Sequence, residues 1–268
     1  MHLEPPLSYQ CFEFRCILTS GNSNPLLVVA REPDGRPTQV VLKVRQPAVP
    51  EGHFGPTSLA CELICAALAR AAGLAVPDYG IATVTREFAE SVPDNTVRDV
   101  LLNNLGPNFA TRYLPGRSPW LPSYSPTGEL LRQLESVMAF DCALINGDRT
   151  CSKPNLLWNG DDVVLIDHSL ALPVHKWSDA QIADSPLMPE HYVRRHATFT
   201  ALANQGRLYE ELFDAWRALP WTDIVLLRSW IPPEWERSPG DVDRIFTFLQ
   251  GRDSRFRDIR DDLRRILR

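Results

Sequence analysis

The sequence lacks the features expected of membrane-spanning, secreted and nucleic-acid-binding proteins. No uninterrupted apolar run approaches the ~18–20 residues that a membrane-spanning helix needs. A signal peptide has a basic stretch followed by an apolar segment. The first residues of this chain lack that pattern and contain Glu4 and two prolines. A formal net charge of -5 at pH 7 gives no overall attraction to nucleic acid. We therefore expect a cytoplasmic protein that binds neither a membrane nor nucleic acid directly.

The sequence also has no CxxC pair and no cysteine–histidine cluster with the spacing of a zinc site. Scattered cysteines in a chain of this length are typical of small, buried apolar residues in a reducing compartment. The six cysteines are Cys11, Cys16, Cys61, Cys65, Cys142 and Cys151. We expect these thiols to be buried, and we expect no zinc.

What is present fits a globular chain with one large domain or two lobes that share a cleft. The 268 residues are 44% apolar and 23% charged, and a domain usually holds ~100–200 residues. No internal repeat is visible.

The first part of the chain is predicted to form a small β-rich lobe. Apolar and β-branched runs alternate with turn-forming clusters, which is typical of an antiparallel meander. A helix of about 15 residues should follow the third run, with Thr57 or Ser58 as its N-cap and Gly73 as its C-cap. Strands are expected at residues 11–19, 25–32, 39–45, 81–87 and 109–115.

The pattern changes near Tyr113, where a predominantly helical region begins. Residues 115–127 contain four prolines and several serines, which favours a linker. Residues 128–145 have the 3.6-residue apolar period of a helix, which Asn146 and Gly147 should close. Two short strands and a mainly helical remainder are expected at residues 155–158, 163–167 and 177–268.

The C-terminal residues 252–268 hold seven arginines and four aspartates around an apolar stripe. Such a helix can bind nucleic acid or a membrane, but more often its stripe packs on the body while its charges stay in water. We expect packing for the stripe formed by Phe256, Ile259, Leu263 and Ile266. The predicted fold class is α+β, with a β-rich N-lobe over residues 1–112 and a helical C-lobe over residues 113–268.

The turn between the first two expected strands is a candidate phosphate-binding loop. It contains Ser20, Gly21, Asn22 and Ser23, and backbone N–H groups in such a polar turn can surround a phosphate. A hairpin of any function could contain the same stretch, so the turn carries weight only together with other elements.

Lys43 and Glu62 form a candidate ion pair. Lys43 lies in the apolar run Val-Val-Leu-Lys-Val, and Glu62 lies on an almost uncharged helix. A buried charge needs a partner because its desolvation is costly. Each residue could reach solvent on its own, but together they resemble the lysine–glutamate pair with which kinases hold nucleotide phosphates.

Asp148, Asn155 and Asp167 provide the strongest chemical signal. Asp148 follows the predicted helix at 128–145, Asn155 begins a short hairpin, and Asp167 ends it. Phosphoryl transfer needs a carboxylate that orients the attacking hydroxyl and a Mg²⁺ ion that neutralises the phosphates. Asp148 suits the first task, and Asn155 and Asp167 offer the hard oxygens that Mg²⁺ prefers. A polar hairpin without activity is the alternative.

The order of these elements resembles the HipA-like kinases. The runs that carry the resemblance are GDRT, PNLLW, LIDHSLAL, the helix around Glu62, and FATRYLPG. The resemblance spans roughly residues 10–180 and points to the small, single-module bacterial branch of that family. It implies a fold shared with protein and phosphoinositide kinases, and the use of ATP and Mg²⁺. The best known member phosphorylates a serine of a protein, but the resemblance does not transfer a substrate to this chain.

Two positions depart from the family pattern. Relatives usually have Asn-Pro-Asn where this chain has Lys153-Pro154-Asn155, and a charged lysine cannot bind Mg²⁺ because it has no acceptor lone pair. Either Asn155 takes the metal position, or one metal site is lost and Lys153 contacts a phosphate. The glycine common after the metal-binding aspartate is replaced by Ser169.

We therefore expect an ATP- and Mg²⁺-dependent kinase that phosphorylates a hydroxyl, on a serine or threonine of a protein. Lys43 would bind phosphates, Glu62 would orient it, and the backbone of Arg112, Tyr113 and Leu114 would receive adenine. The alternatives are a nucleotide-binding pseudokinase or interaction module, and a kinase for a lipid or small molecule. A protein substrate or a partner antitoxin is compatible with the sequence, which identifies neither.

Overall fold

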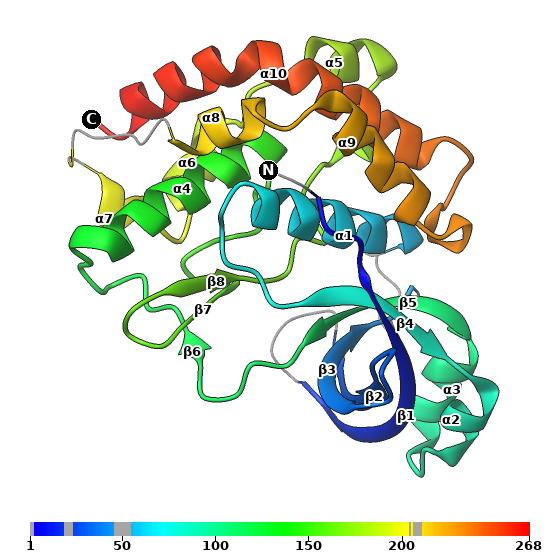
Figure 1. Cartoon of the computed structure of the whole chain (residues 1–268). Coiled ribbons are helices and arrows are strands. Elements are labelled where there is room, and N and C mark those ends of the chain that lie inside the picture. Colours follow the sequence, from blue (N-terminus) through cyan, green and yellow to red (C-terminus); the bar gives the residue numbers. More distant parts are fainter. Residues whose placement is uncertain (1–2, 19–23, 46–54, 204, 206–210) are drawn as a thin grey trace.

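The computed structural model describes residues 3–18, 24–45, 55–203, 205 and 211–268. Within them, a β-barrel lies beside a predominantly helical part (Figure 1). The α+β class predicted from the sequence is confirmed, because strands dominate the first part of the chain and helices the second. None of the helices in the described ranges is both long enough and apolar enough to cross a membrane.

The barrel closes in the strand order β1-β2-β3-β5-β4. Its strands are β1 (Leu7–Ile17), β2 (Leu26–Arg31), β3 (Pro37–Lys43), β4 (Tyr79–Val84) and β5 (Gly106–Arg112). The predicted antiparallel meander of β1, β2 and β3 is confirmed. A parallel pairing of β1 with β4 closes the barrel, with Leu7 opposite Gly80. That pairing joins segments far apart in the chain, and the sequence pattern did not predict it.

Two short helices, α2 (Arg86–Ser91) and α3 (Asn95–Leu102), follow β4 and were not predicted. The Thr85 hydroxyl accepts a hydrogen bond from the Phe88 N–H, and the Asp94 carboxylate accepts one from the Val97 N–H. These N-caps satisfy backbone donors at the helix starts. The strand expected to reach residue 87 therefore ends at Val84. Both helices pack their apolar residues on the barrel core.

Helix α1 (Pro56–Ala71) begins two or three residues earlier than predicted, with Gly55 as its N-cap in place of Thr57 or Ser58. Ser58 lies inside the first turn, where its hydroxyl donates to the Gly55 carbonyl (2.7 Å) instead of capping an N–H group. At the other end Ala72 is the C-cap, and Gly73 follows with a φ of +82°, a conformation that glycine adopts without strain.

The helical part begins with a linker and a small sheet. The sheet strands are β6 (Ser118–Pro119), β7 (Leu156–Trp158) and β8 (Val163–Leu165), and α4 (Gly128–Leu144) lies between the first two in the chain. The helices that follow are α5 (Asp179–Asp184), α6 (Glu190–Arg195), α7 (Phe199–Leu202), α8 (Glu211–Arg217), α9 (Trp221–Leu226) and α10 (Asp241–Ile266). Short 3-10 helices span Val174–Lys176, Leu227–Trp230 and Pro233–Trp235.

Helix α4 ends at Leu144, earlier than the predicted close at Asn146 and Gly147. Ile145 is its C-cap, in the left-handed conformation (φ 52°) that costs a β-branched residue free energy. The Asn146 N–H bonds to the Asp141 carbonyl (2.9 Å), and the Asn146 side-chain amide bonds to the Asp141 carboxylate (2.8 Å). These two bonds hold the chain in a turn directly before Asp148.

The buried apolar residues form two cores, one inside the barrel and one in the helical part. Helix α1 belongs to the second core, since every residue from Leu59 to Ala69 is buried. Figure 1 shows α1 running between the barrel and α10. A helix that is buried on all its sides needs apolar residues all round, as this sequence has. The lobe boundary at residue 112 remains a prediction.

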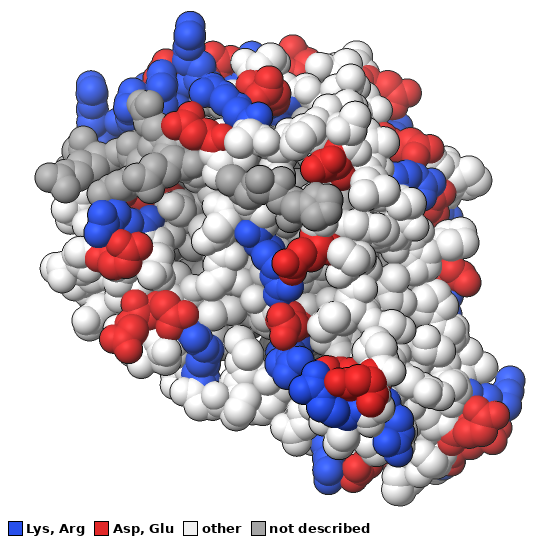
Figure 2. Space-filling view, viewed as in Figure 1, with Lys and Arg blue, Asp and Glu red and all other residues white. Residues whose placement is uncertain are grey.

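The C-terminal stripe packs as expected, because Phe256, Ile259, Leu263 and Ile266 are all buried. Figure 2 shows positive and negative side chains interleaved over this end of α10. Arg252 is an exception to the expected solvation of the arginines. It is fully buried and donates to the Ala143 (2.7 Å) and Cys142 (3.0 Å) carbonyls at the end of α4.

All six cysteines lie in the described residues and are free thiols. Cys11, Cys61, Cys65 and Cys142 are buried, as expected, and burial raises the pKa of each. Cys16 and Cys151 are exposed, which corrects the expectation for these two. Cys16 lies near the end of β1, beyond the part of that strand that packs into the barrel, and Cys151 lies in a surface turn.

Candidate active site

A cleft of about 500 Å³ lies between the barrel and the helical part. Its walls come from β3, β5, α1, the linker after β5 and the segment around β7 and β8. The predicted site residues that line it are Lys43, Glu62, Arg112, Tyr113, Leu114, Lys153, Asn155 and Asp167. Asp148 lies next to this lining, in contact with two of its members. The predicted phosphate-binding turn, formed by Ser20, Gly21, Asn22 and Ser23, lies outside the described residues.

Lys43, Glu62 and Asp167 form a charged cluster at one end of the cleft. The Lys43 ammonium donates to the Glu62 carboxylate and to Asp167 Oδ1 (2.7 Å). Burial alone would lower the pKa of Lys43, but the charges of Asp167 and Glu62 outweigh it and raise that pKa. Burial likewise raises the pKa of Glu62, and Lys43 opposes the shift. The pair predicted from the sequence is therefore present, with Asp167 as a further partner that was not predicted.

Glu62 also reaches the loop that carries Asp167. Its second oxygen accepts the His168 N–H (3.0 Å). Asp167 itself has a φ of 58°, and the Ser169 hydroxyl donates to Asp167 Oδ1 (2.8 Å). Burial would raise the pKa of Asp167, but Lys43 and Lys153 hold it well below its usual range. One carboxylate on α1 thus fixes both the lysine and the backbone beside Asp167.

Asp148, Lys153 and Asn155 form a second group of contacts, which adjoins this cluster at Asp167. The Lys153 ammonium donates to Asp148 Oδ2 (2.6 Å) and lies 3.3 Å from Asp167 Oδ2. The Asn155 side-chain amide donates to the same Asp148 oxygen (3.3 Å). Partial burial would lower the pKa of Lys153, but Asp167 and Asp148 raise it, so its side chain is an ammonium at neutral pH. The structure brings together every described residue predicted to hold metal or phosphate.

The buried side chain of Arg149 supports the loop that carries Asp148 and Asn155. This residue was not identified from the sequence. Its guanidinium is fully buried and pairs with Asp141 of α4, which also accepts from His196 (2.8 Å). Arg149 also donates to the Asn155 and Ile166 carbonyls, the latter at 3.2 Å. One buried arginine therefore holds the backbone of Asn155 and that of Ile166, the residue before Asp167.

The charge balance explains why this arginine can be buried. Burial would raise the pKa of Asp141, but Arg149 and His196 lower it well below its usual range. Burial and the Arg149 charge lower the pKa of His168 to about 3, so its neutral ring can accept from Arg149 (3.3 Å). The sequence did contain a signal for this pair. Asp141 lies among the apolar residues of the predicted helix at 128–145, and a buried charge requires a partner.

Two of the three backbone N–H groups in the segment expected to receive adenine already donate to carbonyls of the protein. The Arg112 N–H donates to the Asp78 carbonyl (2.6 Å), and the Tyr113 N–H donates to the Gln39 carbonyl (2.9 Å). The Leu114 N–H donates to no acceptor among the described residues. Of the three predicted hinge residues, Leu114 is thus the one with a donor available to a ligand.

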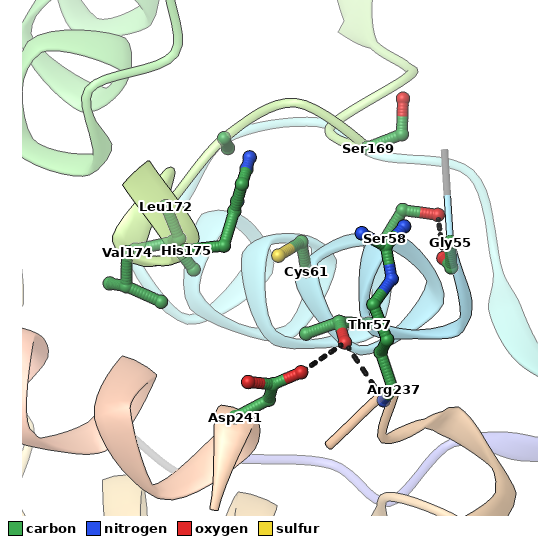
Figure 3. A pocket seen from close by; sticks show the side chains of 11 residues that line it. Gly55, Thr57, Ser58, Cys61, Ser169, Leu172, Val174, His175, Arg237 and Asp241 are labelled. Carbon is green, nitrogen blue, oxygen red and sulfur yellow. Dashed lines mark hydrogen bonds between the residues drawn. The ribbon is translucent and has the colours of Figure 1, made fainter. Parts of the chain in front are cut away.

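A second hollow of about 50 Å³ lies beside the first half of α1 (Figure 3). Three of its lining residues are connected by hydrogen bonds. The Thr57 hydroxyl accepts from the Arg237 N–H (3.3 Å) and donates to Asp241 Oδ2 (3.4 Å). None of the predicted site residues lines it. These contacts attach the start of α1 to α10 and to the segment before it, which helps to fix the helix that carries Glu62.

Comparisons with known proteins identify the family. Residues 49–264 match the family of HipA-like kinases. The chain is similar to the crystal structure of the proinflammatory kinase CtkA of Helicobacter pylori, with 12% identity, a TM-score of 0.53 and coverage of 98% of this chain and 100% of that chain. It is also similar to the Golgi casein kinase, with 12% identity, a TM-score of 0.52 and coverage of 98% and 74%. A search of curated proteins finds no match.

At this identity the two structures bear on the fold alone. Both are kinases, so the two-lobed kinase-like fold predicted from the sequence is confirmed. The family match covers most of the chain and includes Glu62, Asp148, Asn155 and Asp167. The chain therefore belongs to the HipA-like kinases and is a phosphotransferase of that family.

Proposed function

We propose that this kinase uses ATP and Mg²⁺ to phosphorylate a hydroxyl group, on a serine or threonine of a protein. The observation that carries the proposal is the meeting of Lys43, Glu62, Asp148 and Asp167 at one end of a cleft of about 500 Å³. These residues come from four separate segments of the chain. Phosphoryl transfer depends on such positioning and on charge neutralisation, with little covalent chemistry from the protein.

The apolar lining of the cleft suits a nucleotide base. It includes Leu18, Val41, Leu157 and Ile166, and such side chains can desolvate a flat ring. The Leu114 N–H, which bonds to no acceptor in the described ranges, can donate to a ring nitrogen. With adenine there, the triphosphate would extend toward the Lys43 ammonium, which Glu62 holds in place.

The donor set also fits a divalent cation. A carboxylate has about four lone-pair positions, and Asp167 uses three of them for Lys43, Ser169 and Lys153. One position on Oδ2 is left, and the side-chain oxygen of Asn155 is bonded to no described group. Such oxygens are the ligands that Mg²⁺ prefers. A bound Mg²⁺ would neutralise charge on the phosphates.

Asp148 is suited to act on the acceptor. Its Oδ2 is occupied by Lys153 and Asn155, whereas its Oδ1 accepts from no group in the described part of the chain. That oxygen can orient a hydroxyl and accept its proton as phosphate is transferred. The family match names no substrate, so the mass-spectrometric experiment described below tests the choice of a protein as the acceptor.

A nucleotide-binding protein without turnover is a second candidate. The observation that favours it is the ammonium of Lys153, which bonds to the carboxylate that would orient the acceptor (2.6 Å). Mass spectrometry of the purified protein and of a lysate of the source cells, each after incubation with Mg-ATP, separates the two. The kinase adds the mass of phosphate to a protein, and the second candidate adds none.

Calorimetric titration with Mg-ATP tests the assignment of the nucleotide site. Asp167→Asn should weaken Mg-ATP binding at least tenfold, because it removes the charge that the metal requires. Asp161→Asn is the matched control, since Asp161 is exposed on the turn between β7 and β8 and should bind as the parent does. Equal affinity of Asp167→Asn and the parent would contradict the assignment.

A further inference from the structure

The Lys153 ammonium lies beside an oxygen of the predicted metal ligand Asp167. It is 3.3 Å from Asp167 Oδ2 and 2.6 Å from Asp148 Oδ2. In protein kinases, two Mg²⁺ ions beside the phosphates are held by the metal-binding aspartate and an asparagine of the catalytic loop. Here a single positive charge from the chain already bridges Asp148 and Asp167.

The backbone holds Lys153 in this place. Its N–H donates to the Thr150 carbonyl (3.1 Å), and its carbonyl accepts from the Thr150 N–H (3.0 Å). The Thr150 hydroxyl also accepts from the Lys153 N–H (3.3 Å). This tight turn begins two residues after Asp148, so the lysine is carried by the same rigid loop as its partner.

The remaining acceptor positions leave room for one metal ion. Asp167 Oδ1 accepts from Lys43 and from Ser169, and Oδ2 lies 3.3 Å from the Lys153 ammonium, so the described residues leave about one of its four lone-pair positions. Asp148 Oδ2 is used by Lys153 and Asn155, and its Oδ1 is the oxygen assigned above to the acceptor hydroxyl. Mg²⁺ needs oxygen ligands at about 2.0–2.1 Å in near-octahedral geometry, and an ammonium in the same space both blocks and repels it.

We propose that this kinase binds one divalent cation with each nucleotide, and that the Lys153 ammonium takes the place of the second. The inference rests on the proposed nucleotide-binding function. Asp167 and Asn155 then hold the single metal, while Lys153 supplies a fixed charge beside the phosphates. The Lys153 side chain thus supplies part of the positive charge that other kinases obtain from a second bound Mg²⁺ ion.

The test counts bound metal ions and does not depend on activity. Mn²⁺ is titrated into the full chain saturated with a non-hydrolysable imido analogue of ATP, and free Mn²⁺ is measured by its paramagnetic resonance signal. The parent should bind one Mn²⁺ per bound analogue, and Lys153→Asn, which replaces the charge with a metal ligand, should bind two. Lys153→Arg keeps the charge and should bind one. Lys176→Asn is the matched control at an exposed lysine and should also bind one.

Each other outcome overturns the inference in an identifiable way. Two Mn²⁺ ions in the parent would show that Lys153 excludes none. One ion in Lys153→Asn, with the analogue still bound, would show that the lysine is not what prevents a second. Loss of analogue binding in Lys153→Asn would show that metal cannot replace the charge. Failure of the parent itself to bind the analogue would overturn the proposed function together with this inference.

Discussion

At the scale of single residues, the site is a set of buried charges that neutralise one another. Lys43 and Glu62 are largely inaccessible, with side-chain exposures of 14% and 3%. Each would be costly to bury alone. The prediction that they pair followed from that cost and required no knowledge of the fold. The sequence could not indicate that Asp167 also binds Lys43, because this contact joins residues more than a hundred positions apart.

A double-mutant cycle tests this mutual neutralisation. Lys43→Met should reduce the free energy of unfolding by about 3–5 kcal/mol, because it leaves Glu62 as a buried charge without its partner. Adding Glu62→Gln should recover most of that loss, since the glutamine is neutral and of similar size. Urea unfolding of the parent, both single variants and the double variant at pH 7 measures the coupling. A double variant as unstable as the sum of the two single losses would contradict it.

Burial of a thiol should make stability depend on alkaline pH. Burial raises the pKa of Cys11 from about 9 to about 12. Between these pH values the unfolded chain releases this proton while the folded chain keeps it, so stability falls as the pH rises. The slope is about 1.4 kcal/mol per pH unit for one group. Between pH 8 and pH 10, the free energy of unfolding of Cys11→Ala should therefore fall by about 1.4 kcal/mol less than that of the parent.

Cys16→Ala is the control for this prediction, because Cys16 lies on the same strand and is exposed. Urea unfolding in the presence of a reductant, at the two pH values, gives the comparison. The other buried thiols are shared by both variants, so their contribution cancels. Identical pH dependence in Cys11→Ala and Cys16→Ala would show that burial of Cys11 has no such effect.

At the scale of elements, α1 joins the two halves of the site. Its apolar residues belong to the core of the helical part, and Thr57 ties its start to α10. From this fixed helix, Glu62 reaches Lys43 on the barrel and the His168 N–H beside Asp167. The helix is therefore held in the position that the ion pair requires by contacts within the protein itself.

Hydrogen exchange tests this fixed position. Amides in the middle of α1 should exchange as slowly as those of α4, a helix of similar length in the same core, because both can open only when that core opens. Addition of an ATP analogue should change their exchange less than twofold. An α1 that exchanges a hundredfold faster than α4, and becomes protected when the analogue binds, would instead identify it as an element that moves.

At the scale of the whole molecule, the sequence predicted the order of the elements better than their assembly. Periodicity and turn residues are local, so the meander, the helix around Glu62 and the short hairpin before Asp167 were predicted near their observed places. The closure of the barrel was not predictable in this way, because Leu7 pairs with Gly80 far along the chain. The left-handed end of α4 at Ile145 was missed because no glycine marks it.

The same distinction applies to the site. Charged residues in apolar surroundings and the order of Asp148, Asn155 and Asp167 were readable from the sequence. The buried support by Arg149 and Asp141 was not read, although it follows the same rule as Lys43 and Glu62. The bridging position of Lys153 depends on the tertiary fold, because only the folded chain brings Asp148 next to Asp167.

Transfer of labelled phosphate is the most direct test of the central claim that this cleft performs phosphoryl transfer. The parent, Asp148→Asn and the exposed control Asp161→Asn are each incubated with Mg²⁺ and ATP labelled at the γ-phosphate, alone and with a lysate of the source cells. The parent and Asp161→Asn should label a protein, and Asp148→Asn should do so about 10²–10⁴-fold more slowly, the usual contribution of such a group. Equal labelling by Asp148→Asn would contradict its role, and a parent that binds Mg-ATP but transfers label to no protein, lipid or small molecule of the lysate would contradict the kinase assignment itself.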